Sequence, residues 1–208
     1  MSRRSAGRRG PTVVGLLLVS ATLAGCAGGT DLTAEQWTDR MCAAVLPFVR
    51  TATTPPPKAA DPAATAGEIS GYLGRTVEAL DGTLGSLEQL GPAPVDDGEA
   101  IASGLRGGLT DVRTAFATSR TQVDALDKGN PAELERRLPD ALAPVSRLGD
   151  ATGPLAGVAG NPQLGAASRN SANCRDLGAV SRAAQGAPAG PDAAAGPPAA
   201  DTGQGGRN

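Results

Sequence analysis

The feature of this 208-residue sequence that most restricts its fold is a run of large apolar residues between positions 65 and 90. These residues recur every three or four positions, which places them on one face of an α-helix, whereas a half-buried strand alternates every second residue. A capping box, TAGE at 65–68, opens the run, and Gly91-Pro92 closes it, so we expect one helix to fill the segment. The stripe consists of Ile69, Leu73, Val77, Leu80, Leu84, Leu87 and Leu90.

An earlier helix is expected to begin at a second capping box, TAEQ at 33–36. Its apolar stripe contains Trp37 and Phe48, which we expect in the core rather than stacked on a ligand. Pro47 should kink this helix or begin its end, and the proline-rich segment 53–62 is typical of a loop.

A third helix is predicted by the apolar stripe that runs from Ile101 to Leu126. The acidic residues Asp96, Asp97 and Glu99 precede or open this stripe, where the helix dipole favours negative charge. Inside it, the sequence GLRGG at 104–108 carries small residues four apart. We expect these glycines either to let the second and third helices pack closely or to reflect composition alone.

A fourth helix should begin with Asn130 as its cap and Pro131 in its first turn. Pro139 and Pro144 are expected to distort it. Beyond a loop at 149–161, a weaker helix capped by Asn161 should contain four residues of the apolar pattern, namely Leu164, Ala167, Cys174 and Leu177.

The sequence lacks the alternating runs of valine, isoleucine and tyrosine that are typical of strands. We therefore expect an all-α fold, an antiparallel bundle of four main helices plus a short C-terminal helix over residues 33–186. Residues 187–208 are mainly alanine, glycine and proline, so they cannot bury enough surface to fold and should form a disordered tail.

The first residues have the parts of an export signal. Arginines at positions 3, 4, 8 and 9 precede a short apolar stretch at 12–24, which is shorter than the roughly 20 residues of a membrane-spanning helix. The sequence LAGC at 23–26 follows, and it resembles the lipobox of bacterial lipoproteins. The resemblance implies that Cys26 receives a diacylglyceryl group and that a peptidase cuts before it.

The lipoprotein resemblance predicts a signal peptide at 1–25, a tether at 26–32 and anchoring to the extracytoplasmic face of the cell membrane. Two acyl chains are sufficient for stable anchoring, whereas one chain binds only marginally. An ordinary signal peptide and an uncleaved anchor helix remain as alternatives. Ser2-Arg3-Arg4 also faintly resembles a twin-arginine signal, which leaves the export route open between that pathway and general secretion.

With Cys26 taken by lipid, Cys42 and Cys174 are the other cysteines of the sequence. Export would deliver them to an oxidising space, where a pair usually becomes a disulfide. The closed loop would be long, which gives an upper stabilisation of about 4–5 kcal/mol in the chain-entropy model. Two free buried thiols are the alternative.

Composition argues against several functions. The sequence has no histidine, which removes the commonest general base and metal ligand, and aromatic residues make up 2% of it, which disfavours platforms for nucleic-acid bases. The carboxylates Asp96, Asp97 and Glu99 could be imagined as a catalytic group, but helix-start charge is the simpler interpretation. We expect no catalytic residues, no cofactor, no metal site and no nucleic-acid partner.

Two short sequences, WTDRMC at 37–42 and NCRDL at 173–177, resemble those of small secreted, cysteine-stapled helical proteins of actinobacteria, which are mostly uncharacterised. This resemblance implies a bundle with a disulfide and transfers no active site. Two functions remain: a non-catalytic binding or accessory module that contacts an envelope protein, or a carrier of a small apolar ligand. The carrier would need a pocket between helices, lined by Leu84, Leu105, Leu109 and Leu142.

Overall fold

The computed structural model describes residues 32–57, 59–150 and 153–186, and these residues form α-helices with one short 3-10 turn and no strand. The predicted all-α class is therefore confirmed for the described part. The predicted signal peptide, the lipobox with Cys26, most of the tether and the tail at 187–208 lie outside the described residues. The elements are, in order, α1 (Ala34–Ala52), α2 (Pro62–Leu90), α3 (Gly98–Asp124), α4 (Pro131–Ser146), η1 (Arg147–Asp150), α5 (Ala156–Gly160), α6 (Pro162–Asn170) and α7 (Ala172–Ala184).

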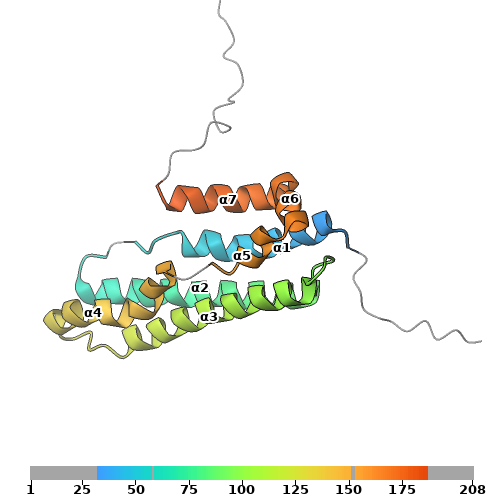
Figure 1. Cartoon of the computed structure of the whole chain (residues 1–208). Coiled ribbons are helices and arrows are strands. Elements are labelled where there is room, and N and C mark those ends of the chain that lie inside the picture. Colours follow the sequence, from blue (N-terminus) through green and yellow to red (C-terminus); the bar gives the residue numbers. More distant parts are fainter. Residues whose placement is uncertain (1–31, 58, 151–152, 187–208) are drawn as a thin grey trace, which may run out of the picture.

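Helix α1 lies between two groups of helices. Figure 1 shows it beneath α7 and above the pair formed by α2 and α3, and it contacts α2 on one side and α6 and α7 on the other. The predicted capping box is confirmed: Thr33 Oγ1 accepts from the Gln36 amide, and the Gln36 side chain accepts from the Thr33 amide. Pro47 does not end the helix, which continues to Ala52.

Three side chains fasten α1 to α2 by donating to main-chain carbonyls. Trp37 Nε1 donates to Gly91 O at 3.1 Å, Tyr72 Oη to Ala52 O at 2.7 Å, and Thr83 Oγ1 to Ala44 O at 2.9 Å. Trp37 is 1% exposed and belongs to the core as predicted, whereas Phe48 is half-buried against it. These bonds set how α1, which carries Cys42, lies on α2.

Helix α2 begins earlier than the sequence interpretation placed it. The TAGE box at 65–68 is not the start, because Asp61 caps the helix by accepting from the Ala64 amide at 2.8 Å and Pro62 occupies the first position. Proline suits that position, since the amide it lacks would have no helical partner there. The predicted end at Leu90 is confirmed, with Gly91 at a positive φ of 73°.

A tight connection leads from α2 to α3. Asp97 adopts φ 59° and does not cap α3 with its side chain. Gly98 follows, and a β-carbon there would overlap the carbonyl oxygen of Ala93, so glycine is required. Together these two residues let the chain reverse within a few positions.

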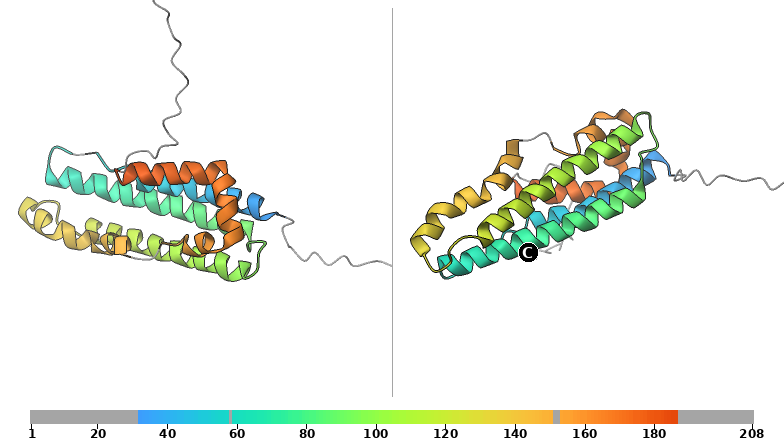
Figure 2. Two further views of the ribbon diagram at one scale, coloured as in Figure 1. Left: turned by 45° about the horizontal axis from the view of Figure 1, so that its top comes forward. Right: turned by 90° about the horizontal axis from the view of Figure 1, so that it is seen from below.

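Helices α2, α3 and α4 pack through large apolar side chains. The two long helices lie side by side, and α4 packs mainly on α3 and also touches α2 (Figure 2). Leu80, Leu105 and Leu109 are at most 3% exposed. The apolar stripes of the second and third helices therefore meet in this contact. Asn130 and Pro131 begin α4 as predicted, and Pro139 and Pro144 lie within it without breaking it.

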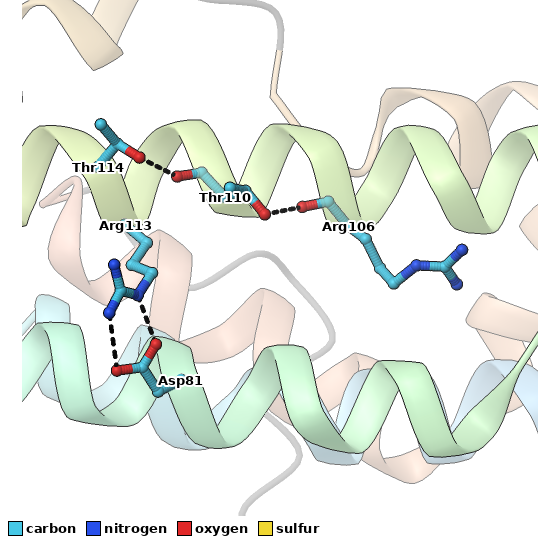
Figure 3. Close-up of polar contacts among 5 residues, drawn as sticks. All are labelled: Asp81, Arg106, Thr110, Arg113 and Thr114. Atoms are coloured by element: carbon cyan, nitrogen blue, oxygen red, sulfur yellow. Dashed lines mark hydrogen bonds and ion pairs between the residues drawn. The ribbon is translucent and has the colours of Figure 1, made fainter.

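Polar contacts accompany this packing at the surface. Arg113 of α3 donates to both carboxylate oxygens of Asp81 of α2, with Nη2 to Oδ2 at 3.2 Å (Figure 3). The hydrogen bond and the negative charge of Asp81 raise the pKa of the Arg113 guanidinium. On α3 itself, the hydroxyls of Thr110 and Thr114 donate to carbonyls one turn earlier.

The C-terminal third departs most from expectation. The segment 149–161 is not only a loop, since η1 extends through Asp150 and α5 covers Ala156–Gly160. The single last helix is wrong as well: Ser171 adopts an extended conformation and divides it into α6 and α7. The glycines at 104–108 do not bring α2 and α3 together, because Gly108 faces Pro154 and Gly104 faces open space.

Candidate binding groove beside the disulfide

A disulfide joins the first long helix to the last. Cys42 of α1 is 3% exposed and is bonded to Cys174 of α7, 132 positions later. The structure thus contains the predicted pair rather than two free thiols. Cys174 Sγ also lies 3.6 Å from the carbonyl oxygen of Thr38, which places α7 directly against the α1 backbone.

A polar cluster next to the disulfide holds the same two helices. The Asp39 carboxylate accepts from Ser171 Oγ at 2.7 Å and from Asn173 Nδ2 at 2.9 Å. Ser171 Oγ in turn accepts from the Cys174 amide at 3.1 Å and so caps α7. The hydrogen bond from Ser171 is the main reason why the pKa of Asp39 lies below its ordinary value.

An apolar groove opens beside the disulfide, and both cysteines line it. It has a volume of about 360 Å³ and lies between α1, α5, α6 and α7. We call it the disulfide groove. Its lining consists of Met41, Cys42, Leu155, Val158, Ala159, Gly165, Ser168, Arg169, Cys174, Leu177, Gly178 and Ser181.

The groove is more apolar than its two serines suggest. Ser168 Oγ donates to Leu164 O at 2.8 Å and Ser181 Oγ donates to Leu177 O at 2.9 Å, so both hydroxyl protons are already used within their own helices. Met41, Val158 and Leu177 are buried beneath the groove. The disulfide adds two sulfur atoms to this lining. The groove can therefore take up apolar groups without leaving a hydroxyl donor unpaired.

The remaining sites considered from sequence are placed elsewhere. Asp96, Asp97 and Glu99 are exposed around the start of α3, and Glu99 lies 3.6 Å from Arg106 in an ion pair. Glu99 and Arg106 border a second groove of about 460 Å³ between α2 and α3. In the described ranges, no group of three or more metal-ligating side chains comes together.

The four leucines expected to line a carrier pocket belong to the hydrophobic core or pack against it, and Leu84 borders the groove between α2 and α3. Leu105 and Leu109 are buried in the core, and Leu84 and Leu142 pack partly exposed against it. The open apolar space lies instead beside Cys42 and Cys174. Sequence reasoning missed this groove because it depends on short side chains, which leave no periodic signal.

The Asp39 cluster was also missed, although part of it was visible. Ser171 stands three positions before Cys174, which is the spacing of a helix cap, and that pattern could have placed the break between α6 and α7. The pairing with Asp39 joins residues far apart in sequence, and no local pattern predicts it.

Comparison with known proteins returned no family model, curated protein or solved structure that matches this chain. Among the helices that the structure describes, none is long and apolar enough to cross a membrane.

Proposed function

We propose that the protein is a non-catalytic binding or accessory module of the cell envelope, held on the extracytoplasmic face of the membrane by lipid on Cys26. Its frame would be the antiparallel arrangement of the four main helices α1 to α4. The disulfide groove would be its binding site. The sequence supports the anchor through LAGC at 23–26, and it supports a non-catalytic role through the absence of histidine.

The observation that carries this proposal is the disulfide groove itself. Apolar surface normally lies buried, and an open apolar concavity on a helical body is a typical binding site. The groove lies between α1, α5, α6 and α7, and the disulfide joins α1 to α7. Such a covalent link keeps the site formed without requiring a ligand to hold it.

The test of the anchor uses membrane fractionation. In the proposal, Cys26→Ala releases the protein from membranes or leaves an uncleaved precursor. Cys26→Ala protein that is processed normally and still requires detergent for extraction would contradict the anchor.

The test of the site uses affinity purification from detergent-solubilised membranes, in which both co-purifying proteins and bound lipids are identified. Gly178→Leu places a large side chain in the groove, whereas Gly107→Leu makes the same change on an exposed face of α3. A protein or lipid that is retained by wild type and Gly107→Leu but lost from Gly178→Leu supports the proposal. A profile unaffected by Gly178→Leu would argue against the groove as the binding site.

The groove also favours a second candidate, the carrier of a small apolar ligand. Its volume of about 360 Å³ falls within the range of roughly 300–1,000 Å³ that is typical of small-molecule sites. A stable protein partner usually covers about 20–30 residues on each side, which is larger than the groove alone. Loss of a lipid but not of a protein in Gly178→Leu would favour the carrier.

A further inference from the structure

Two glycines that line the disulfide groove are each followed four residues later by an arginine. On α6, Arg169 Nη1 lies 4.0 Å from the position that a β-carbon of Gly165 would occupy. On α7, Arg182 Nη1 lies 3.7 Å from the corresponding position at Gly178. Because residues four apart face the same side of a helix, each guanidinium folds back over the space that the glycine leaves.

These arginines give the groove a positive edge. Arg169 lines the groove directly and is exposed, whereas Arg182 reaches it only through its position over Gly178. Neither forms an ion pair with another residue of the described ranges, although five other ion pairs are found there. The residues that line the groove include no carboxylate. A negative group at this edge would therefore meet a guanidinium without displacing an existing partner.

We propose that the disulfide groove binds an anionic amphiphile with a single acyl chain, such as a fatty acid. The chain lies over Met41, Leu177 and Gly178, and the carboxylate pairs with Arg169. Both parts of the ligand follow from the site: the lining has no free hydroxyl proton to offer a polar chain, and the edge offers a cation. The inference rests on the proposed function only in taking this groove as the binding site.

The size of the groove favours this ligand over a protein segment. A volume of about 360 Å³ fits a small molecule, and the two serines and two glycines along its walls leave room for a chain without large polar groups beside it. An amphiphile also places its charged end at the exposed edge, where Arg169 remains in contact with water. A neutral hydrocarbon would leave that guanidinium without a partner.

The test uses a photoactivatable laurate analogue, with a diazirine on its chain, added to the cell fraction that contains the full-length protein. After irradiation, the labelled peptide is located by mass spectrometry, and the half-saturating concentration is measured. Unlabelled laurate, dodecanol and acetate are added as competitors. Laurate tests the acyl chain together with the carboxylate, dodecanol tests the hydrocarbon chain without a charge, and acetate tests the carboxylate without a long chain.

Labelling is expected on α1, α6 or α7 around the disulfide. Laurate should compete best, dodecanol at a concentration about tenfold higher, and acetate not at all, since a tenfold change in affinity is a typical cost of one lost ionic contact. Gly178→Leu should raise the half-saturating concentration at least about tenfold, and Gly107→Leu should leave it unchanged. Both leucines improve helix propensity, so neither variant should melt below wild type.

Arg169→Gln separates the charge from the fold, because this side chain is exposed. It should weaken competition by laurate about tenfold and leave competition by dodecanol unchanged, and Arg182→Gln should have a smaller effect. The proposal is overturned if labelling spreads over the molecule without saturating, or if Gly178→Leu is labelled like wild type. If Arg169→Gln weakened competition by laurate and by dodecanol equally, the anionic head group would not be part of the ligand that the groove recognises.

The outcome does not depend on where the protein resides, since the experiment follows it in whichever fraction holds it. A failed Cys26 anchor would therefore leave the labelling result intact. Conversely, an unlabelled groove would leave the anchor and any protein partner unaffected.

Discussion

The contact between α2 and α3 differs in kind from the contact between α1 and α7. The first buries large side chains along two long helices, including Leu80 and Leu109. The second relies on a disulfide, the Asp39 cluster and one buried leucine of α7, Leu177. Many shared apolar contacts make the first interface cooperative, whereas the second depends on a few separate groups. That difference lets a small apolar groove remain open beside the second interface.

The largest effect is expected from a charge placed in the α2–α3 interface. Leu80→Asp should unfold the whole domain, because an unpaired buried charge costs several kcal/mol and loss of the buried leucine about 2–5 kcal/mol more, which together rival the roughly 5–15 kcal/mol by which a domain is stable. Thermal unfolding followed by circular dichroism measures the loss of stability. Thr118→Asp, at an exposed position of α3, is the control for an added carboxylate and should melt close to wild type. An unchanged melting temperature for Leu80→Asp would contradict the packing described.

Removal of the disulfide should have a smaller and more local effect. The double variant Cys42→Ala with Cys174→Ala should lose about 2–5 kcal/mol of stability. Hydrogen exchange should increase mainly in α5, α6 and α7, since α2, α3 and α4 keep their own apolar contacts.

Mass spectrometry of the non-reduced wild type should first show the Cys42–Cys174 linked peptide. Exchange that rises equally in α2–α4 and α5–α7 would show that the two regions unfold as one unit and would contradict the comparison.

Asp39→Asn tests the polar part of the α1–α7 contact. The variant should lose about 1 kcal/mol, since a neutral amide accepts more weakly from Ser171 and Asn173 and the cluster is only half-buried. Asp111→Asn, at an exposed position of α3, serves as the control and should leave the stability of the protein unchanged.

The same variant gives a pH dependence with a defined sign. Because the folded state lowers the pKa of Asp39, the stabilisation is present above the unfolded-chain pKa of about 3.9 and is lost as pH falls through the lower folded value. The difference in melting temperature between wild type and Asp39→Asn should thus be constant near neutral pH and shrink in acid. A difference that grows in acid would contradict this role.

The smallest effect is expected from the surface pair of the α2–α3 interface. Arg113→Gln should lower the melting temperature slightly at low salt, and the effect should vanish in high salt, because Arg113 and Asp81 are exposed to solvent and screened. A double-mutant cycle with Asp81→Asn isolates their coupling. Strong coupling that persists in high salt would mean that this interface depends on charge more than on burial.

Sequence periodicity was sufficient to predict the helices that bury large side chains. The core positions of α1, α2, α3 and α4 follow helical spacing, so these four helices could be predicted from the sequence. The start of α2 was placed at Thr65, although Asp61-Pro62 is the same cap-and-proline signal that was recognised at Asn130-Pro131. The cap and proline at Asp61-Pro62 could have placed this start correctly, but the TAGE box favoured a later start.

The candidate site was less accessible because its parts are small or distant in sequence. The disulfide was predicted from the expected export and from the number of cysteines, not from geometry. The groove depends on Gly165 and Gly178, which composition alone could explain, and on the break at Ser171, which divides the last helix. Asp39 meets Ser171 only after the chain has folded. Local sequence patterns reveal where large side chains pack. They do not reveal a groove that forms because small residues leave space.

The disulfide also changes what a protease can do to this protein. Cys42 and Cys174 are 132 positions apart in sequence, so they enclose the chain from the middle of α1 through most of the body. A single cut anywhere between them, including the proline-rich sequence between α1 and α2, opens a ring without releasing a fragment. The nicked molecule would gain only the mass of one water under non-reducing conditions and would separate into two pieces only after reduction. Resistance to fragmentation is thus a property of the topology, independent of how stable the fold is.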